Sequence, residues 1–249
     1  MSYLQSFILG LLQGLTEFLP VSSSGHTLLA GYLLGVEIPL AFELILHLAT
    51  LLAVIIFYRK SVFTRIKHPF CKGNLYLALA TAVTAVIAFL FRKFYADGLS
   101  SITLLPLFFA LTAGILVVGS WVKPKPSNIS AGKSAIIGLT QGLACIPGLS
   151  RSGTTISTAL ILGIDKQEAT EFSFLLSIPI VLGSAIIELI TQPLVGVSFP
   201  VLAVGFITAF ISGYFALHIV SKLIKNASLD VFSVYLIALS LTLILFKAM

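Results

Sequence analysis

Charged side chains are scarce in this chain of 249 residues, which has 15 lysines and arginines and 9 aspartates and glutamates, or 10% of the sequence. Soluble globular domains carry about 25% charged residues. Because 58% of the residues are hydrophobic and the mean hydropathy is +1.09, too few polar groups remain to cover a folded chain of this size. This scarcity excludes a water-soluble globular domain and predicts a membrane protein.

Cysteines and long runs of like charge are also lacking. The two cysteines, Cys71 and Cys145, lie far apart, which excludes a disulfide framework and a cysteine-based metal site. The net charge of +6 is spread over the gaps between apolar stretches, so it indicates membrane topology and argues against nucleic acid as a partner. Membrane lipids are the expected surroundings, and the sequence leaves the oligomeric state open.

Six apolar stretches approach the length of about 20 residues that a helix needs to cross a bilayer. They are residues 38–58, 75–91, 102–122, 169–191, 199–222 and 229–246. Two further apolar regions, 2–35 and 134–163, are interrupted by the polar sequences FLPVSSSGHT and CIPGLSRSGTT. We therefore expect an all-α membrane protein with six transmembrane helices and two re-entrant helical hairpins.

The distribution of lysine and arginine predicts the orientation of these spans. The connections 59–74 and 123–133 carry five and three basic residues, whereas 92–101 carries two basic residues and one aspartate. Cytoplasmic connections are enriched in lysine and arginine. The two basic connections are therefore expected in the cytoplasm and the 92–101 connection outside. Both termini are expected outside if the region before residue 38 returns to its own side.

An internal repeat relates the two interrupted regions. When the chain is compared with itself at an offset of 128 residues, residues 6–35 align with 134–163 without a gap and 13 of the 30 positions are identical. We interpret the chain as one integral membrane domain, 1–249, with repeat halves at about 1–122 and 134–249. Three crossings separate equivalent points, so the halves have inverted topology, and interrupted helices of such repeats meet near the midplane to bind substrate.

Arg151 stands in the interruption of the second hairpin, where an unpaired arginine costs on the order of 3 kcal/mol or more in a membrane. Hydroxyls and glycines surround it, and helix N-terminal amides with a bidentate guanidinium bind phosphate well. The alternative is a structural salt bridge from Arg151 to Glu17 or Glu188. The substrate-binding candidates here are Gly148, Ser150, Ser152, Gly153, Thr154 and Thr155.

Glu17 occupies the interruption of the first hairpin, one helical turn after Gln13. A carboxylate, a run of hydroxyls and an imidazole at one helix break provide a base, a nucleophile and an electrostatic clamp for phosphoryl chemistry. The alternative is a helix cap beside a core histidine. The residues that follow Glu17 and contribute these groups are Ser22, Ser23, Ser24, Gly25 and His26, and with Gln13 they complete the candidate site.

Other polar residues in the apolar stretches are expected to be structural. Glu43 and His47 stand one turn apart and are interpreted as a hydrogen-bonded pair. Glu188 lies near the outer end of its span, where a long side chain reaches the interface. Cys145, beside the second break, is expected to be a small core residue because nothing nearby marks a thiolate site.

The sequences QGLTEFLPVSSSGH and PGLSRSGTT together resemble the two signature motifs of the bacitracin-resistance type of undecaprenyl-diphosphate phosphatase, a family of bacterial inner-membrane proteins. The resemblance covers nearly the whole chain. It implies six spanning helices with two re-entrant hairpins, and hydrolysis of a polyprenyl diphosphate lipid, which recycles the carrier for cell-wall synthesis and confers bacitracin resistance. It also implies catalytic roles for Glu17, Ser23, His26 and Arg151.

Gln13 departs from the pattern of that family, which usually has a glutamate at this position. The loss of one carboxylate weakens a two-carboxylate scheme and a metal site. A divalent cation, Mg²⁺ or Ca²⁺, can still be held by Glu17 together with phosphate oxygens of the substrate.

We therefore expect Glu17 to deprotonate Ser23 or a water, Arg151 and nearby amides to bind the diphosphate, and His26 to assist the leaving group, in a site that opens to the outer face. The rival hypothesis is a flippase for polyprenyl phosphates without phosphatase activity, because inverted repeats with broken helices are common in transporters.

Overall fold

The computed structural model describes residues 1–94, 101–122, 127–191, 196–226 and 228–248. Within these ranges the chain forms helices and no strands, so the all-α fold class is confirmed. The first six helices are α1 (Tyr3–Phe18), α2 (Ser23–Leu34), α3 (Leu40–Phe57), α4 (Arg59–Lys67), α5 (Lys72–Phe94) and α6 (Leu105–Trp121). The others are α7 (Ala131–Leu143), α8 (Arg151–Ile161), α9 (Lys166–Thr191), α10 (Phe199–Asn226) and α11 (Asp230–Ala248).

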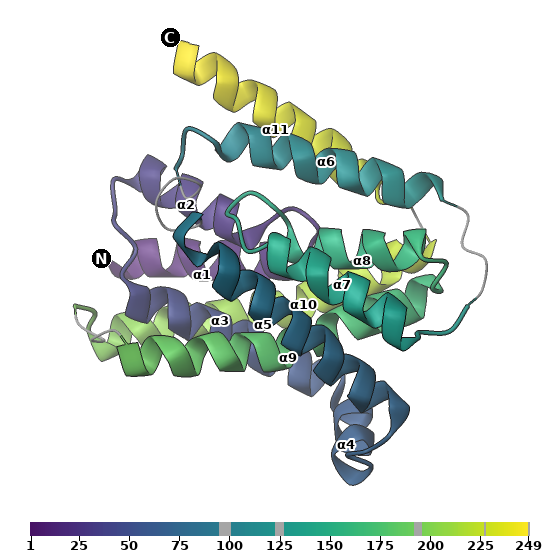
Figure 1. Cartoon of the computed structure of the whole chain (residues 1–249). Helices are drawn as coiled ribbons and strands as arrows, with labels where there is room; N and C mark the ends of the chain where they lie inside the picture. The colour runs from purple at the N-terminus through teal and green to yellow at the C-terminus, as the bar shows by residue number, and fades with distance from the viewer. Residues whose placement is uncertain (95–100, 123–126, 192–195, 227, 249) are drawn as a thin grey trace.

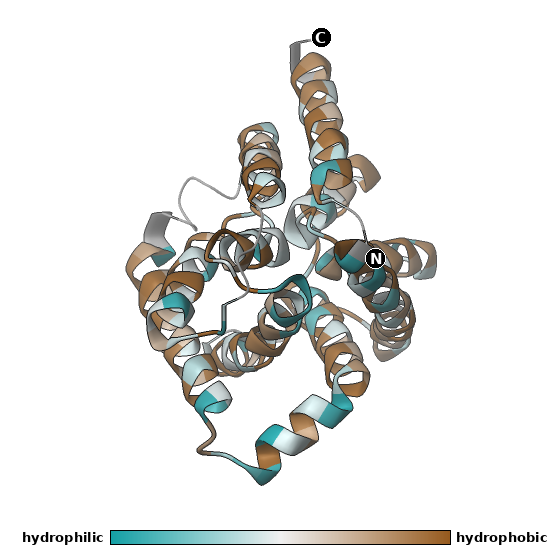
Figure 2. Ribbon diagram, turned by 90° about the vertical axis from the view of Figure 1, so that its right-hand side faces the viewer, coloured by the Kyte–Doolittle hydropathy of each residue, from teal (hydrophilic) through white to brown (hydrophobic). Residues whose placement is uncertain are grey.

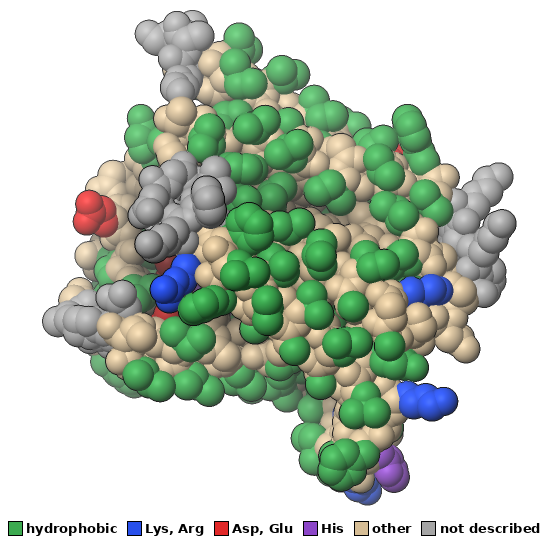
Figure 3. Space-filling model, in the orientation of Figure 1, with side chains coloured by type: hydrophobic (Ala, Val, Ile, Leu, Met, Phe, Trp, Pro, Cys, Tyr) green, Lys and Arg blue, Asp and Glu red, His purple; other side chains and the backbone are tan. Residues whose placement is uncertain are grey.

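The longer helices have the character of membrane spans. Among the described residues, α3, α5, α9 and α10 are long and apolar enough to cross a membrane, and α6 and α11 are shorter apolar helices. Figure 2 views the bundle from one end, and apolar residues dominate most of its ribbons. On the face seen in Figure 3, apolar side chains spread over the surface, while charged ones lie toward the edges and on α4. This outer surface suits lipid, and the chain is an integral membrane protein.

Two helical hairpins, α1–α2 and α7–α8, turn back inside the molecule (Figure 1). A proline in each turn, Pro20 or Pro147, explains why the first helix of each hairpin ends, because proline has no N–H for a helical hydrogen bond and disfavours helical geometry in the residue before it. The next helix begins at a serine cap, Ser22 or Ser150, whose hydroxyl accepts a backbone N–H of the first turn. The starts of α7 and α8 lie 128 residues after those of α1 and α2, which is the offset of the sequence repeat.

Each hairpin packs closely against a long helix that is distant in the sequence. α1 packs along α10, and α7 packs along α5. Glycines permit both approaches: a Cβ at Gly14 would lie 2.4 Å from the carbonyl oxygen of Ala209, and one at Gly138 would lie 2.4 Å from that of Ala80. Either hairpin is therefore seated on a helix from the other half of the chain.

The connection between residues 59 and 74 contains a helix, α4, which the sequence analysis treated only as a basic connection. No residue of α4 is buried, and its last turn carries Arg65 and Lys67. It projects at the bottom of the view in Figure 1. It was missed because it has no apolar run of the kind used to identify spans, and basic side chains near its C-terminus favour a helix through the helix dipole.

Candidate active site

A cavity of about 350 Å³ lies where the two hairpins meet. The end of α1, the start of α2, the turn before α8 and the start of α8 line it together with residues of α3 and α9. Its polar lining residues are Glu17, Ser22, Ser23, Ser24, His47, Ser150, Arg151, Ser152, Ser184 and Glu188, together with Cys145. Residues from both interrupted regions are thus brought to one cavity, as the repeat predicted.

Glu17 is the centre of this polar group. One carboxylate oxygen, Oε1, pairs with Nη2 of Arg151, and the other, Oε2, accepts a hydrogen bond of 2.6 Å from Ser23 Oγ. The side chain of Glu17 is almost fully buried, whereas that of Arg151 remains partly exposed. The sequence offered this ion pair as a purely structural alternative for Arg151. Both residues line the cavity, however, and Arg151 keeps guanidinium N–H groups that can bind an anion.

Gln13 lies behind Glu17 and does not line the cavity. Its Nε2 donates a hydrogen bond of 2.9 Å to Glu17 Oε2, and Gln13 is only 1% exposed. The amide therefore orients the carboxylate from inside the protein. This placement supports an indirect role, whereas the sequence placed Gln13 among the groups that bind substrate.

Two helix N-termini point toward the cavity, those of α2 and α8. Ser22 Oγ accepts hydrogen bonds from the backbone N–H of Gly25 (3.3 Å) and of Gly148 (3.0 Å), which ties the two turns together. The φ angle of Ser22 is 70°, which few non-glycine residues adopt. Ser150 Oγ accepts from the N–H of Gly153 at 3.1 Å. Paired N-termini with an arginine form a surface for an anion.

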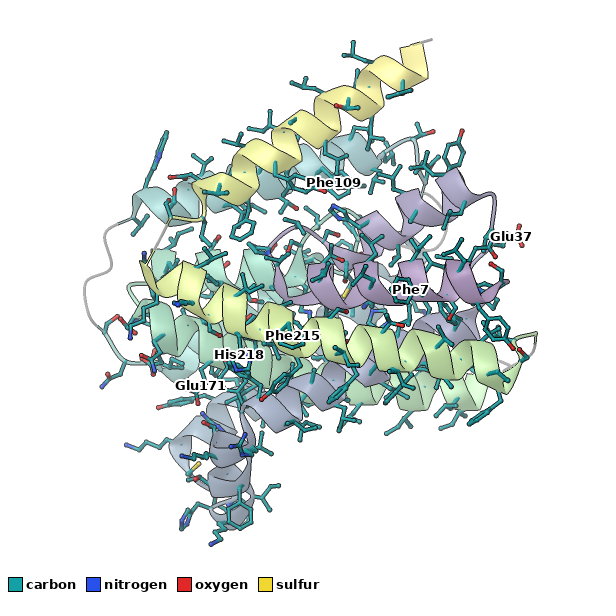
Figure 4. The ribbon with its side chains drawn as sticks, turned by 180° about the vertical axis from the view of Figure 1, so that it is seen from behind. Phe7, Glu37, Phe109, Glu171, Phe215 and His218 are labelled. Carbon is teal, nitrogen blue, oxygen red and sulfur yellow. The ribbon has the colours of Figure 1, made fainter. Side chains whose placement is uncertain are left out.

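His26 lies outside the cavity, although the sequence placed it among the catalytic groups. Its Nδ1–H donates to the carbonyl oxygen of Ser22 at 2.7 Å, and its Nε2 accepts from the hydroxyl of Tyr235 at 2.8 Å. The ring stacks on Tyr235 and lies 5.2 Å, between ring centroids, from Phe109, which is labelled in Figure 4. With 6% exposure and both nitrogens occupied, His26 holds the turn at Ser22 in place.

The remaining predicted substrate-binding residues support the turns and do not line the cavity. Thr155 exchanges a hydrogen bond of 2.5 Å with Ser173 of α9. Gly148 adopts a φ of +95°, so its backbone conformation favours glycine, and its carbonyl oxygen accepts from Thr112 at 2.8 Å. Thr154 is buried, and its hydroxyl has no hydrogen-bond partner in the part of the chain that the structure describes.

His47 and Glu188 line the cavity, although the sequence analysis gave them structural roles. His47 does bond to Glu43, but through the backbone: its Nδ1–H donates to the carbonyl oxygen of Glu43 at 2.9 Å. The spacing of four residues between Glu43 and His47 predicted only that these two residues share a helix face. Which face meets the cavity depends on how α3 packs against α9, and a single helix sequence carries no such signal.

Comparison with known proteins matches most of the chain to one family. Residues 6–242 match the family described as bacitracin resistance protein BacA. The chain belongs to this family. The undecaprenyl-diphosphatase of Treponema denticola is 42% identical to it, covering 98% of this chain and 97% of the relative. The undecaprenyl-diphosphatases of Carboxydothermus hydrogenoformans and Methanobrevibacter smithii are 37% and 38% identical, covering 100% and 94% of this chain and 98% and 94% of the relatives.

This member of the bacitracin resistance family has few metal donors at its cavity. No group of three or more histidine, cysteine, aspartate or glutamate residues is arranged to hold a metal among the residues that the structure describes. Both oxygens of Glu17 already accept hydrogen bonds, and Gln13 supplies a neutral amide. The protein groups present do not form a Mg²⁺ or Ca²⁺ site by themselves.

Proposed function

We propose that this protein hydrolyses undecaprenyl diphosphate to undecaprenyl phosphate and inorganic phosphate, which returns the lipid carrier to cell-wall synthesis. One observation carries the proposal: a single carboxylate, Glu17, contacts both the hydroxyl of Ser23 and the guanidinium of Arg151 in a cavity where two helix N-termini meet. The activity named for its relatives from three organisms fits that chemistry.

In this mechanism Glu17 acts as the base for Ser23. Glu17 takes the Ser23 proton through the existing hydrogen bond, the oxygen bonds to the terminal phosphorus, and the bridging P–O bond breaks. The bond electrons leave with the lipid monophosphate, which is a good leaving group at neutral pH. Arg151 and the amides at the starts of α2 and α8 hold the transferring phosphoryl group, so positioning and charge neutralisation supply most of the acceleration.

The membrane arrangement that we propose has α3, α5, α6, α9, α10 and α11 as six spans and the two hairpins as re-entrant elements. The basic helix α4 lies on the cytoplasmic side, and the cavity opens to the outer face of the bacterial inner membrane. The open end of the first hairpin, where α1 begins and α2 ends, lies at one end of the bundle in Figure 1, and the open end of the second, where α7 begins and α8 ends, lies at the other. This arrangement supports an inverted repeat of about 1–122 and 134–249.

Thiol labelling in intact cells tests this orientation. In a Cys145→Ser variant, the remaining native Cys71, next to α4, is expected to be shielded from an impermeant thiol reagent. In a variant with Cys71→Ser, Cys145→Ser and Ser101→Cys, the new thiol is expected to react, because Ser101 is exposed and follows the proposed span α5, whereas Cys71 precedes it. The reverse labelling pattern would overturn the orientation and leave the inverted repeat intact.

Phosphate release from undecaprenyl diphosphate by the purified protein tests the function. We expect wild-type protein to release phosphate, and Ser23→Ala to lose about a hundredfold or more of the rate. Ser24→Ala is the matched control, because Ser24 lines the same cavity without a bond to Glu17. Translocation of lipid phosphate in vesicles without phosphate release would support the rival flippase and overturn the phosphatase.

Chelator treatment tests the role of a divalent cation. We propose that any Mg²⁺ or Ca²⁺ enters with the substrate, bound by Glu17 and phosphate oxygens together. The expected result is a modest loss of rate with chelator, which excess Mg²⁺ reverses. Complete loss of activity with chelator would contradict this proposal.

A further inference from the structure

His26 and His47, the two histidines near the cavity, differ in how many of their ring nitrogens make hydrogen bonds. His26 is buried, and both of its nitrogens are bonded within the protein. His47 is half-buried on α3 and lines the cavity. The histidine that the sequence motif singles out is therefore placed behind the site, and a histidine outside the motif faces it.

The hydrogen bond of His47 decides its tautomer. A backbone carbonyl only accepts hydrogen bonds, so Nδ1, at 2.9 Å from the Glu43 oxygen, carries the ring proton. In the neutral ring Nε2 is then the basic nitrogen, and it has no hydrogen-bond partner within the described residues. A fixed tautomer with a free Nε2 on a cavity wall is the arrangement that a general base requires.

Charged groups from several helices surround His47. Its ring interacts electrostatically with Glu17 of α1 and with Glu188 of α9, and both carboxylates line the same cavity. Glu43 lies one turn earlier on α3, and Arg151 of α8 is neutralised in part by its pair with Glu17. A positive charge formed on the imidazole would therefore lie near Glu188, and near Glu17 once Glu17 regains its charge by returning its proton to Ser23.

We propose that His47 is a catalytic residue of this cavity and accepts, at Nε2, a proton from the water that releases phosphate from Ser23. This inference rests on the phosphatase function proposed above. The water oxygen bonds to phosphorus, and the bond between phosphorus and Ser23 Oγ breaks. Glu17 then returns to Oγ the proton that it took in the first step. The proton on Nε2 leaves to solvent through the open cavity before the next cycle.

Glu17 and His47 are needed as bases in different steps, because Glu17 is already protonated when the water attacks. After the first step Glu17 carries the Ser23 proton, so it is not a base for water in the second step. Its Oε1 is paired with Arg151 and its Oε2 accepts from Gln13 and Ser23. A second base is needed, and the missing glutamate at position 13 cannot provide it. His47 lines the same cavity and satisfies that need.

His47→Gln is the deciding variant, and His218→Gln is its matched control. His218 makes the same bond as His47, from Nδ1 to the carbonyl oxygen four residues earlier, at 3.0 Å, but it lies near Glu171 at another part of the molecule (Figure 4). Each protein is mixed with undecaprenyl diphosphate and quenched with acid, after which free phosphate and phosphoserine at position 23 are measured by mass spectrometry.

We expect His47→Gln to lower steady-state phosphate release by about a hundredfold or more and to accumulate phosphoserine at Ser23, while His218→Gln behaves as wild type. Added imidazole is expected to restore part of the rate to His47→Ala, which separates lost chemistry from lost folding. Wild-type rates in His47→Gln, or a slow variant without phosphoserine, would overturn the role of His47. Absence of phosphate release from wild-type protein would overturn the proposed function and this inference with it.

Discussion

The hairpins α1–α2 and α7–α8 share a backbone design and differ in their chemistry. In both, a serine caps the second helix by accepting the N–H of a glycine three residues later. At the next position the first hairpin has Ser23 and the second has Arg151. At the end of the preceding helix the first has Glu17, where the repeat offset places Cys145 in the second.

The repeated hairpin backbone therefore supplies a helix N-terminus in each half, whereas the carboxylate, the hydroxyl and the guanidinium of the site each occur in one half only. The carboxylate and the hydroxyl come from one half and the guanidinium comes from the other, and Glu17 binds both. A symmetric pair of hairpins therefore forms an asymmetric site. Substitutions at equivalent positions of the two hairpins should therefore have unequal effects on activity or stability.

The largest difference in kcat is expected between the variants Glu17→Gln and Cys145→Ser, which change equivalent positions of the two hairpins. Glu17→Gln removes the base for Ser23 and leaves Arg151 without its carboxylate, so kcat should fall by about a hundredfold to ten-thousandfold. Cys145→Ser should change kcat by a few-fold at most, because the thiol only borders the cavity. Steady-state phosphate release measures both, and equal losses would mean that the two positions are not differentiated.

Arg151→Lys should reduce activity by about a hundredfold without loss of folding. A lysine keeps the charge but not the planar fork that contacts Glu17 and two phosphate oxygens together. Arg59→Lys, at the exposed first position of α4, is the control for the same change of residue type. Near-normal kcat/KM in Arg151→Lys would show that charge alone is sufficient at the second hairpin.

Gln13→Glu and Gln141→Glu occupy equivalent positions and should differ in their response to metal. Gln13→Glu places a second carboxylate beside Glu17, where a pair of carboxylates shares a proton or a cation, so Mg²⁺ should stimulate its rate more than that of wild type. Gln141 donates to Thr84 at 3.1 Å, away from the cavity, and Gln141→Glu should only destabilise the fold. Rates measured over a Mg²⁺ titration, with and without chelator, provide the comparison.

The smallest difference is expected between Ser22→Ala and Ser150→Ala, and it concerns the Tm of thermal unfolding. Each variant loses a helix cap, which costs about 1 kcal/mol. Ser22→Ala also leaves the buried N–H of Gly148 without its acceptor, which adds about 1–3 kcal/mol. A lower Tm for Ser22→Ala than for Ser150→Ala is therefore expected, and equal values would mean that the link between the turns contributes little.

Much of this architecture was accessible from the sequence because its signals are local. The polar sequences FLPVSSSGHT and CIPGLSRSGTT predicted two interrupted helical regions, and the repeat predicted that both breaks would meet. The predicted stretch 38–58 corresponds to α3 at Leu40–Phe57, and 102–122 corresponds to α6 at Leu105–Trp121. Apolar length decides these elements, so they need no knowledge of their partners.

The side-chain orientations were not accessible, since contacts between distant residues determine them. His26 faces away from the cavity because Tyr235, 209 residues later, donates to its Nε2. Gln13 faces Glu17 from the protein interior because α1 packs on α10. His47 gave no sequence signal beyond its spacing from Glu43, which left open whether the pair bonds through side chains or through the backbone.

The ion pair between Glu17 and Arg151 joins residues 134 positions apart, and this has a consequence for biosynthesis. The ribosome delivers the carboxylate long before the guanidinium that neutralises it, and α1 also packs against α10, which is made late. A buried charge without its partner is costly in a membrane. The segment that is translated first is therefore expected to be among the last to reach its final depth, and a nascent chain arrested after α6 should still expose its N-terminal hairpin to proteases.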